Sequence, residues 1–120
     1  MANKCEFHED EYRELLRKIT SVLEKQIEIS FAYLQGTLKD TSPGDLSIAA
    51  YCQVPKAFTT DFELDMSVYI QHEAGHPVEF KIMNRTPPTF QLSVLNDGHL
   101  LYERDRKQRL AYFERIGSLS

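Results

Sequence analysis

The stretch "FAYLQGTLKDTSPGDLSIAAY", residues 31–51, decides the fold because it joins two apolar runs through a dense cluster of turn-forming residues. The first run extends from Ile27 to Leu34 and is rich in β-branched and aromatic side chains, which is typical of a strand. After the turn residues, a second strand is predicted from Asp45 to about Val54, where Pro55 ends it. Taken alone, this pattern is either a simple hairpin or part of a phosphate and metal site.

Helices are predicted on both sides of these two strands. Residues 8–26 carry apolar side chains three and four positions apart, which places them on one helical stripe: Tyr12, Leu15, Leu16, Ile19, Val22 and Leu23. A second helix is predicted to start at Thr59 or Thr60, either of which can cap it, and to end at Gly75 and Pro77. Its inward side chains are expected to be Phe62, Met66, Tyr69 and Ile70.

The rest of the chain predicts two more strands and two more helices. Residues 78–83 alternate as in a strand, residues 84–88 form a turn, and a short helix with Phe90, Val94 and Leu95 inward ends at residues 96–98. A brief strand over 99–103 and a charged helix over about 105–116 follow. The predicted order is αββαβαβα, an α/β (α+β) fold in which a small mixed sheet is flanked by helices. We expect one domain over residues 1–120.

Composition and charge narrow the classes of function. Fourteen lysines and arginines against eighteen aspartates and glutamates give a net charge of −4, so direct binding to nucleic acid or to an anionic membrane is not expected. No apolar run approaches the roughly 20 residues of a membrane span. Cys5 and Cys52 lack CxxC spacing and the N-terminus lacks a basic and apolar signal region, so a reduced, cytoplasmic setting is expected.

One motif matches a zinc site by its letters. Residues 72–76 read His-Glu-Ala-Gly-His, the H-E-x-x-H pattern in which two histidines on one helical face bind zinc. However, Gly75 terminates helices and Pro77 disfavours helical backbone at His76, so His76 is expected to leave the helix. We therefore interpret the motif as a helix C-terminus whose histidines interact favourably with the helix dipole.

Several motifs in order resemble those of the minimal nucleotidyltransferases (MNT) of the DNA polymerase β superfamily, which are often encoded beside a partner of the HEPN type. The strand Phe31–Leu34 enters Gly36-Thr37, where the family has Gly-Ser, and Asp45-Leu46-Ser47 stands where the family has Asp-x-Asp. Residues 75–80 are similar to the family's Gly-x-Pro-Val-Asp-Leu strand. Residues 84–88 and 94–105 follow its asparagine, its double proline and its "LxxGxLLYERD" signature.

The resemblance implies a nucleotidyltransferase fold and a site that positions a nucleotide and divalent ions. In the family, two Asp-x-Asp carboxylates lie on one strand face about 7 Å apart and bracket the ions, and a third carboxylate comes from a neighbouring strand. The Gly-Ser turn offers backbone N–H groups and a hydroxyl to the triphosphate.

Carried over to this chain, the resemblance assigns nucleotide binding to Gly36 and Thr37 and suggests Lys39 as a replacement for lost basic character. The loop from Gly36 to Asp45 is shorter than the family's, which includes an Ala-Arg-Gly segment.

The metal positions correspond to Asp45, Ser47 and Glu79, of which Asp45 and Glu79 are the catalytic candidates. Ser47 puts a neutral hydroxyl where the family has its second carboxylate. Each residue also has an ordinary structural interpretation. Asp45 would be a strand-edge cap, Ser47 a small residue facing the first helix, Glu79 with Lys81 a solvated strand face, and residues 36–37 a common turn.

Two functions follow from the resemblance. The first is a nucleotidyltransferase-fold protein with an impaired active site that binds a HEPN-type partner, as the antitoxin half of a toxin–antitoxin pair. The alternative is an active enzyme that uses Mg²⁺ and ATP and transfers AMP to a protein hydroxyl. The impaired form would need no cofactor, and nucleotide binding and a homo-oligomer remain open in both cases.

Overall fold

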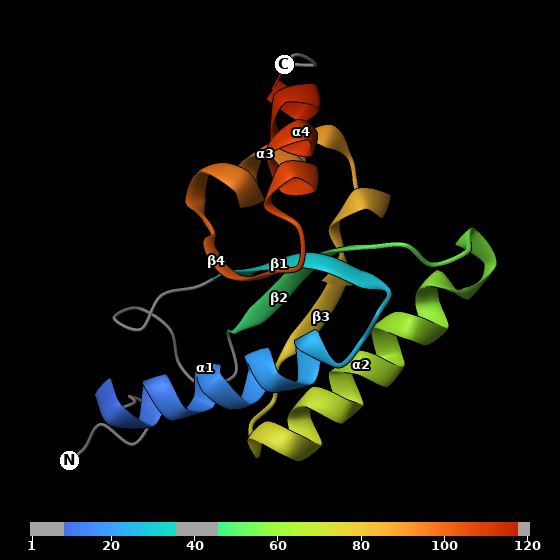
Figure 1. Cartoon of the computed structure of the whole chain (residues 1–120). Coiled ribbons are helices and arrows are strands. Elements are labelled where there is room, and N and C mark those ends of the chain that lie inside the picture. Colours follow the sequence, from blue (N-terminus) through green and yellow to red (C-terminus); the bar gives the residue numbers. More distant parts are fainter. Residues whose placement is uncertain (1–8, 36–45, 118–120) are drawn as a thin grey trace.

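The structure, a computed structural model, describes residues 9–35 and 46–117. Its helices and strands follow the predicted order αββαβαβα (Figure 1). They are α1 (Glu9–Glu24), β1 (Ile29–Gln35), β2 (Ser47–Cys52), α2 (Thr59–Ala74), β3 (Glu79–Ile82), α3 (Pro88–Asp97), β4 (His99–Glu103) and α4 (Arg106–Gly117). Single 3₁₀ turns precede α2 and follow β3, at Lys56–Phe58 and Met83–Arg85.

The four strands form one mixed sheet in the order β3-β2-β1-β4. Strand β1 is antiparallel to both of its neighbours, whereas β2 and β3 are parallel because α2 carries the chain back between them. Helices α1 and α2 cover one face of the sheet, and α3 and α4 cover the other (Figure 1). The predicted fold class is therefore confirmed.

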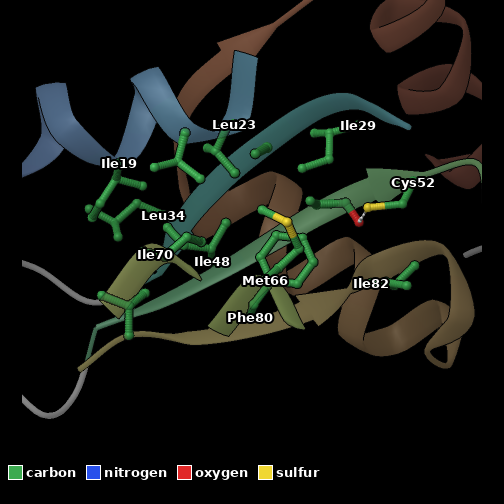
Figure 2. Close-up of a cluster of buried hydrophobic side chains, with 14 of the residues drawn as sticks. Ile19, Leu23, Ile29, Leu34, Ile48, Cys52, Met66, Ile70, Phe80 and Ile82 are labelled. Atoms are coloured by element: carbon green, nitrogen blue, oxygen red, sulfur yellow. Dashed lines mark hydrogen bonds between the residues drawn. The ribbon is translucent and has the colours of Figure 1, made fainter. Parts of the chain in front are cut away.

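The larger core cluster lies between the sheet and helices α1 and α2, and Figure 2 shows its side chains. The predicted apolar stripe of α1 faces the sheet, and Ile19 and Leu23 are fully buried. Met66 and Ile70 bring the inner face of α2 to the same cluster. Each fully buried aliphatic side chain of this kind contributes about 1.5–3 kcal/mol to folding.

The second cluster, under α3 and α4, is aromatic. The ring of Phe31 stacks on that of Tyr51, with centroids 5.2 Å apart, and Tyr112 of α4 meets Tyr51 edge-on at 4.9 Å. Burial raises the pKa of Tyr112, whose hydroxyl donates to the side-chain oxygen of Gln91 in α3. This contact ties the two helices of the layer to each other.

Two predicted element starts are wrong. Strand β1 begins at Ile29, because a turn in which the Ile29 N–H donates to the Gln26 carbonyl (3.1 Å) leaves the Ile27 side chain 81% exposed. Helix α2 is not capped by a threonine, because the 3₁₀ turn runs directly into it and the Lys56 carbonyl accepts the Thr59 N–H. The predicted strand start at Asp45 lies outside the described residues.

The C-terminus of α2 follows the prediction. Gly75 adopts left-handed backbone with φ 71°, and its N–H donates to the Gln71 carbonyl at 2.8 Å. His76 has left the helix, and its Nδ1 lies 2.8 Å from the Pro77 carbonyl oxygen, whereas His72 remains on α2. The two histidines of the H-E-x-x-H pattern therefore do not share a helical face.

Side chains of α2 cover the outer edge of β3. Ser67 Oγ accepts the Phe80 N–H at 3.2 Å, and the Glu63 carboxylate accepts the Ile82 N–H at 2.8 Å. These backbone donors point away from β2, so without the helix they would lie open to a strand of another chain. Within the described residues, no helix is both long and apolar enough to span a bilayer.

Candidate functional site

Three polar side chains form a row across one end of the sheet: Gln35 ends β1, Ser47 begins β2 and Glu79 begins β3. Ser47 is the register partner of Gln35 on one side and of Glu79 on the other. Neighbouring strands lie about 4.8 Å apart, so the three residues are adjacent. The Glu79 N–H donates to the Leu46 carbonyl at 3.1 Å, which fixes the register at this end.

The row faces the layer of α3 and α4. Ile48 and Phe80, the next residues of β2 and β3, belong to the opposite core cluster, and successive strand residues point to opposite faces. Ser47 is half-buried and Glu79 is exposed. The structure thus brings together two of the three predicted metal positions, a hydroxyl and a carboxylate, with an amide beside them.

The remaining predicted site residues, Gly36, Thr37, Lys39 and Asp45, lie outside the described residues, so their positions stay predictions. In the described part of the chain, no three His, Cys, Asp or Glu side chains are grouped so that they could hold a metal ion.

The side chains of the row carry oxygen atoms, the kind of ligand that Mg²⁺ prefers. Magnesium prefers oxygen ligands and is often held by one or two carboxylates while substrate phosphates and water supply the rest. Glu79 supplies one carboxylate, and Ser47 supplies an oxygen without a charge. This donor set suits an ion that arrives with a nucleotide better than an ion caged by protein side chains alone.

Two residues of this region were not predicted as site residues. Gln35 immediately precedes the predicted phosphate turn, and strand alternation from Phe31 and Tyr33 places it on the face of the row. Lys81 is the register partner of Ala49, two positions after Glu79 on the same face, and its Nζ lies 5.6 Å from the centre of the Phe90 ring. The alternation of Glu79 and Lys81 was the available signal, but it equally describes a solvated strand face.

The "LLYERD" signature, residues 100–105, has a structural role in this chain. Glu103 accepts hydrogen bonds from Arg109 Nε at 2.6 Å and from Arg106 Nε at 3.3 Å, both from α4. Arg109 also donates to the hydroxyl of Tyr33 at 3.1 Å. The hydrogen bond from Arg109, with that from Arg106, holds the pKa of Glu103 below its usual value.

The next two signature residues fasten other elements. Arg104 donates from its guanidinium to the carbonyls of Ile29 (3.3 Å) and Gln26 (3.0 Å), which ties β4 to the turn between α1 and β1. Asp105 accepts the backbone N–H groups of Lys107 (2.9 Å) and Gln108 (3.4 Å) and so caps α4. The signature thus fixes the C-terminal end of β4 to α4 and to the turn between α1 and β1.

The asparagine before the double proline is also structural. Asn84 accepts the Cys52 N–H with Oδ1 and donates from Nδ2 to the Cys52 carbonyl, both at 3.0 Å. The amide therefore acts as an extra strand residue beside the end of β2. Arg85 adds a hydrogen bond to the Val54 carbonyl at 2.8 Å. Cys52 itself is buried, and burial, followed by the charges of Glu28 and Glu63, raises the pKa of its thiol, so it is a poor nucleophile.

Comparison with known proteins agrees with the fold. The polymerase beta nucleotidyltransferase family matches residues 17–107, which include the whole row. No curated protein matches the sequence significantly.

Solved structures of toxin–antitoxin complexes share the fold. A chain of the MntA–HepT complex aligns with TM-score 0.69 and 14% identity over 89% of this chain and 85% of that one. A structure of the tri-AMPylated Shewanella oneidensis HEPN toxin with its MNT antitoxin gives TM-score 0.69 and 13% identity over 89% and 84%. A toxin–antitoxin structure with AMP-PNP gives TM-score 0.64 and 13% identity over 94% and 86%. The family match covers most of the chain and the fold agrees with it, so the sequence resemblance is confirmed and the chain belongs to the polymerase beta nucleotidyltransferase family.

Proposed function

We propose that this chain is an MNT-type antitoxin that acts by binding a HEPN-type partner and whose own nucleotidyltransferase site is impaired. The observation that carries the proposal is the pair Ser47 and Glu79: they are register partners at the starts of β2 and β3, and Ser47 stands where the family has its second aspartate. The site therefore keeps its framework and lacks one negative charge.

The missing charge matters because nucleotidyl transfer depends on neutralising phosphate charge through bound cations. Removal of one preorganised stabilising group from an active site typically costs about 10²–10³ in kcat, or about 2.7–4 kcal/mol. A binding surface elsewhere on the fold is unaffected by such a loss. Partner binding can therefore persist after catalysis has weakened.

The comparisons support the choice of partner. The structures described above pair the fold with a toxin, and in one of them the HEPN toxin is AMPylated. A cytoplasmic location belongs to the same proposal, because the two cysteines lack CxxC spacing and Cys52 is a free, buried thiol, which fits a reducing compartment.

An active enzyme is the second candidate, and the exposure of Glu79 beside the Ser47 hydroxyl favours it. In that case Glu79 would accept the proton of an acceptor hydroxyl while the new bond forms between that oxygen and the α-phosphorus of ATP. The bond from the α-phosphorus to the bridging oxygen breaks, and pyrophosphate leaves. Asp45, Ser47 and Glu79 would hold the Mg²⁺ that neutralises the phosphates.

One set of labelling reactions distinguishes the impaired antitoxin from the active enzyme. The chain is co-purified with the product of the adjacent gene, and transfer of label from ATP to that protein is measured with Mg²⁺. Impairment predicts a stable complex, little label from the wild type, and more label from Ser47→Asp. Ser93→Asp, on the exposed surface of α3, is the matched control for added charge and is expected to leave transfer unchanged.

Strong transfer by the wild type that disappears in Asp45→Ala or Glu79→Gln would establish the enzyme and contradict the impaired site. Failure of the two proteins to form a complex would contradict the antitoxin role.

A further inference from the structure

A groove lies at the N-terminal end of α2, beside the start of β1 and the end of β2, whereas the row of Gln35, Ser47 and Glu79 lies at the opposite end of these strands. It has a volume of about 380 Å³ and is lined by Glu28, Val54, Pro55, Phe58, Asp61, Phe62 and Asp65. Its walls are two phenylalanines, a valine and a proline, and its charged groups are three carboxylates. We call these seven residues the α2 groove.

All the charged side chains that line the groove are acidic. No basic residue lines it, and none of the ion pairs within the described part of the chain involves Glu28, Asp61 or Asp65. Arg85 donates to the Val54 carbonyl and Arg104 donates to the Ile29 carbonyl, next to Glu28, but neither guanidinium is part of the lining. Asp61 lies in the first turn of α2 and stabilises the helix dipole, but Glu28 and Asp65 have no such role.

Exposed apolar side chains lie in the groove, on the 3₁₀ turn before α2, and beside it on α2 itself. Phe58 is 57% exposed, Leu64 is 62% exposed and Val68 is 69% exposed. Leu64 and Val68 are four positions apart and so lie on one face of α2, next to the face of Asp61 and Asp65. The inner face of α2 is already filled by Met66 and Ile70, so the helix is apolar on both sides. Single exposed apolar residues are ordinary, but a cluster around a groove indicates an interaction site.

We infer that the α2 groove is the docking site for an arginine of a protein partner, with Leu64 and Val68 covered by apolar side chains around that arginine. Charge complementarity selects a cation, and the aromatic walls select the guanidinium over an ammonium. The guanidinium is planar, stacks on aromatic faces and binds carboxylates with two parallel hydrogen bonds. The identity of the partner as a HEPN-type protein rests on the proposed function, whereas the chemistry of the groove does not.

The test in the complex uses the double variant Glu28→Gln with Asp65→Asn, which keeps the shape of the groove and leaves the first turn of α2 intact. Its affinity for the product of the adjacent gene is expected to fall about tenfold or more, and the salt dependence of binding is expected to weaken. The matched control is Asp97→Asn with Glu114→Gln, which removes two exposed charges from α3 and α4. Far-UV circular dichroism checks the fold of each variant. Unchanged affinity of the groove variant, or an equal loss in the control, overturns the docking site and leaves the proposed function standing.

A second measurement needs no partner protein. N-acetyl-arginine amide is titrated into the labelled chain, and amide shifts are followed by NMR. Shifts are expected at Val54, Phe58 and Phe62, and they should be absent in the groove variant and with N-acetyl-citrulline amide, the neutral analogue. If the adjacent gene product does not bind at all, the proposed function fails, and this titration alone decides the groove. Absence of shifts with the wild type, or equal shifts with the neutral analogue, overturns the inference.

Discussion

Glu103 is the residue through which β4 holds α4, because it accepts hydrogen bonds from both Arg106 and Arg109. Its carboxylate is partly exposed, with 19% of the side chain accessible, so water and salt screen the pairs to some extent. The lowered pKa shows that the folded state favours the ionised form. Its contribution to stability must therefore depend on pH.

For Glu103→Gln, we expect lower stability than the wild type at pH 7 and a smaller difference in acid. The folded-state pKa of Glu103 lies below the unfolded value of about 4.3, so its stabilisation is present above that pH and is lost as the pH falls through the folded pKa. The measurement is the urea midpoint of both proteins across this range. Glu114→Gln on the exposed side of α4 is the control. A difference between Glu103→Gln and the wild type that stays constant with pH would contradict the role assigned to the charge.

Asn84→Ala is expected to lower the free energy of unfolding by about 1–3 kcal/mol, because the Cys52 N–H and carbonyl both lose their partner in a half-buried position. Urea unfolding measures the change. Asn96→Ala, at an exposed position of α3, should stay within about 0.5 kcal/mol of the wild type. Equal effects of the two substitutions would mean that the double hydrogen bond contributes nothing.

At the scale of elements, Gly75 determines where α2 stops. A Cβ at this position would meet no heavy atom within 4 Å, so the effect of a side chain comes from the backbone alone. Gly75→Ala is therefore expected to cost about 1–2 kcal/mol for left-handed backbone.

The matched control for Gly75→Ala is Gly117→Ala in α4, where a Cβ also meets nothing and φ is not positive. It should leave stability unchanged or slightly raised. Thermal unfolding monitored at the helical signal distinguishes the two variants, and a neutral Gly75→Ala would refute the account of the helix end.

The kinds of element and their order were predictable because helical and strand periodicities are strong local signals. The errors fall where neighbouring structure overrides local preference. Ile27 looks like a strand residue, yet the turn fastened by Arg104 carries it into solvent. Thr59 looks like a helix cap, yet the preceding 3₁₀ turn supplies the carbonyls instead.

The candidate site was predictable only in part. Glu79 and Ser47 are 32 positions apart, and their adjacency depends on the parallel pairing of β2 with β3, which local patterns do not specify. The expectation that Ser47 and Glu79 lie on neighbouring strands came from the family resemblance. Gln35 and Lys81 were not predicted, because a polar residue on a strand, even in the alternation of Glu79 and Lys81, equally describes a solvated strand face.

For the whole molecule, both core clusters depend on the same sheet. Alternate residues of β1 and β2 enter the two clusters, so Ile48 packs against α1 and α2 while Ala49 faces α3 and α4. Loss of either helical layer would expose one face of every strand. The two layers should therefore unfold together.

Urea unfolding is expected to show one transition, with coincident midpoints for the backbone signal in far-UV circular dichroism and the tyrosine signal in near-UV circular dichroism. The tyrosine signal reports strongly on the second cluster, which contains Tyr33, Tyr51 and Tyr112. An earlier loss of the tyrosine signal would show that the layer of α3 and α4 is a separate cooperative unit and would contradict the predicted single domain.

Because Glu63 and Ser67 bond the outer N–H groups of β3, that edge of the sheet is closed to pairing with another strand. With those two N–H groups already bonded, a strand from another molecule can extend the described sheet only at the outer edge of β4. Pairing of two molecules through their sheets would therefore join one β4 edge to another and stop at a dimer, and charged substitutions meant to improve solubility belong on that strand.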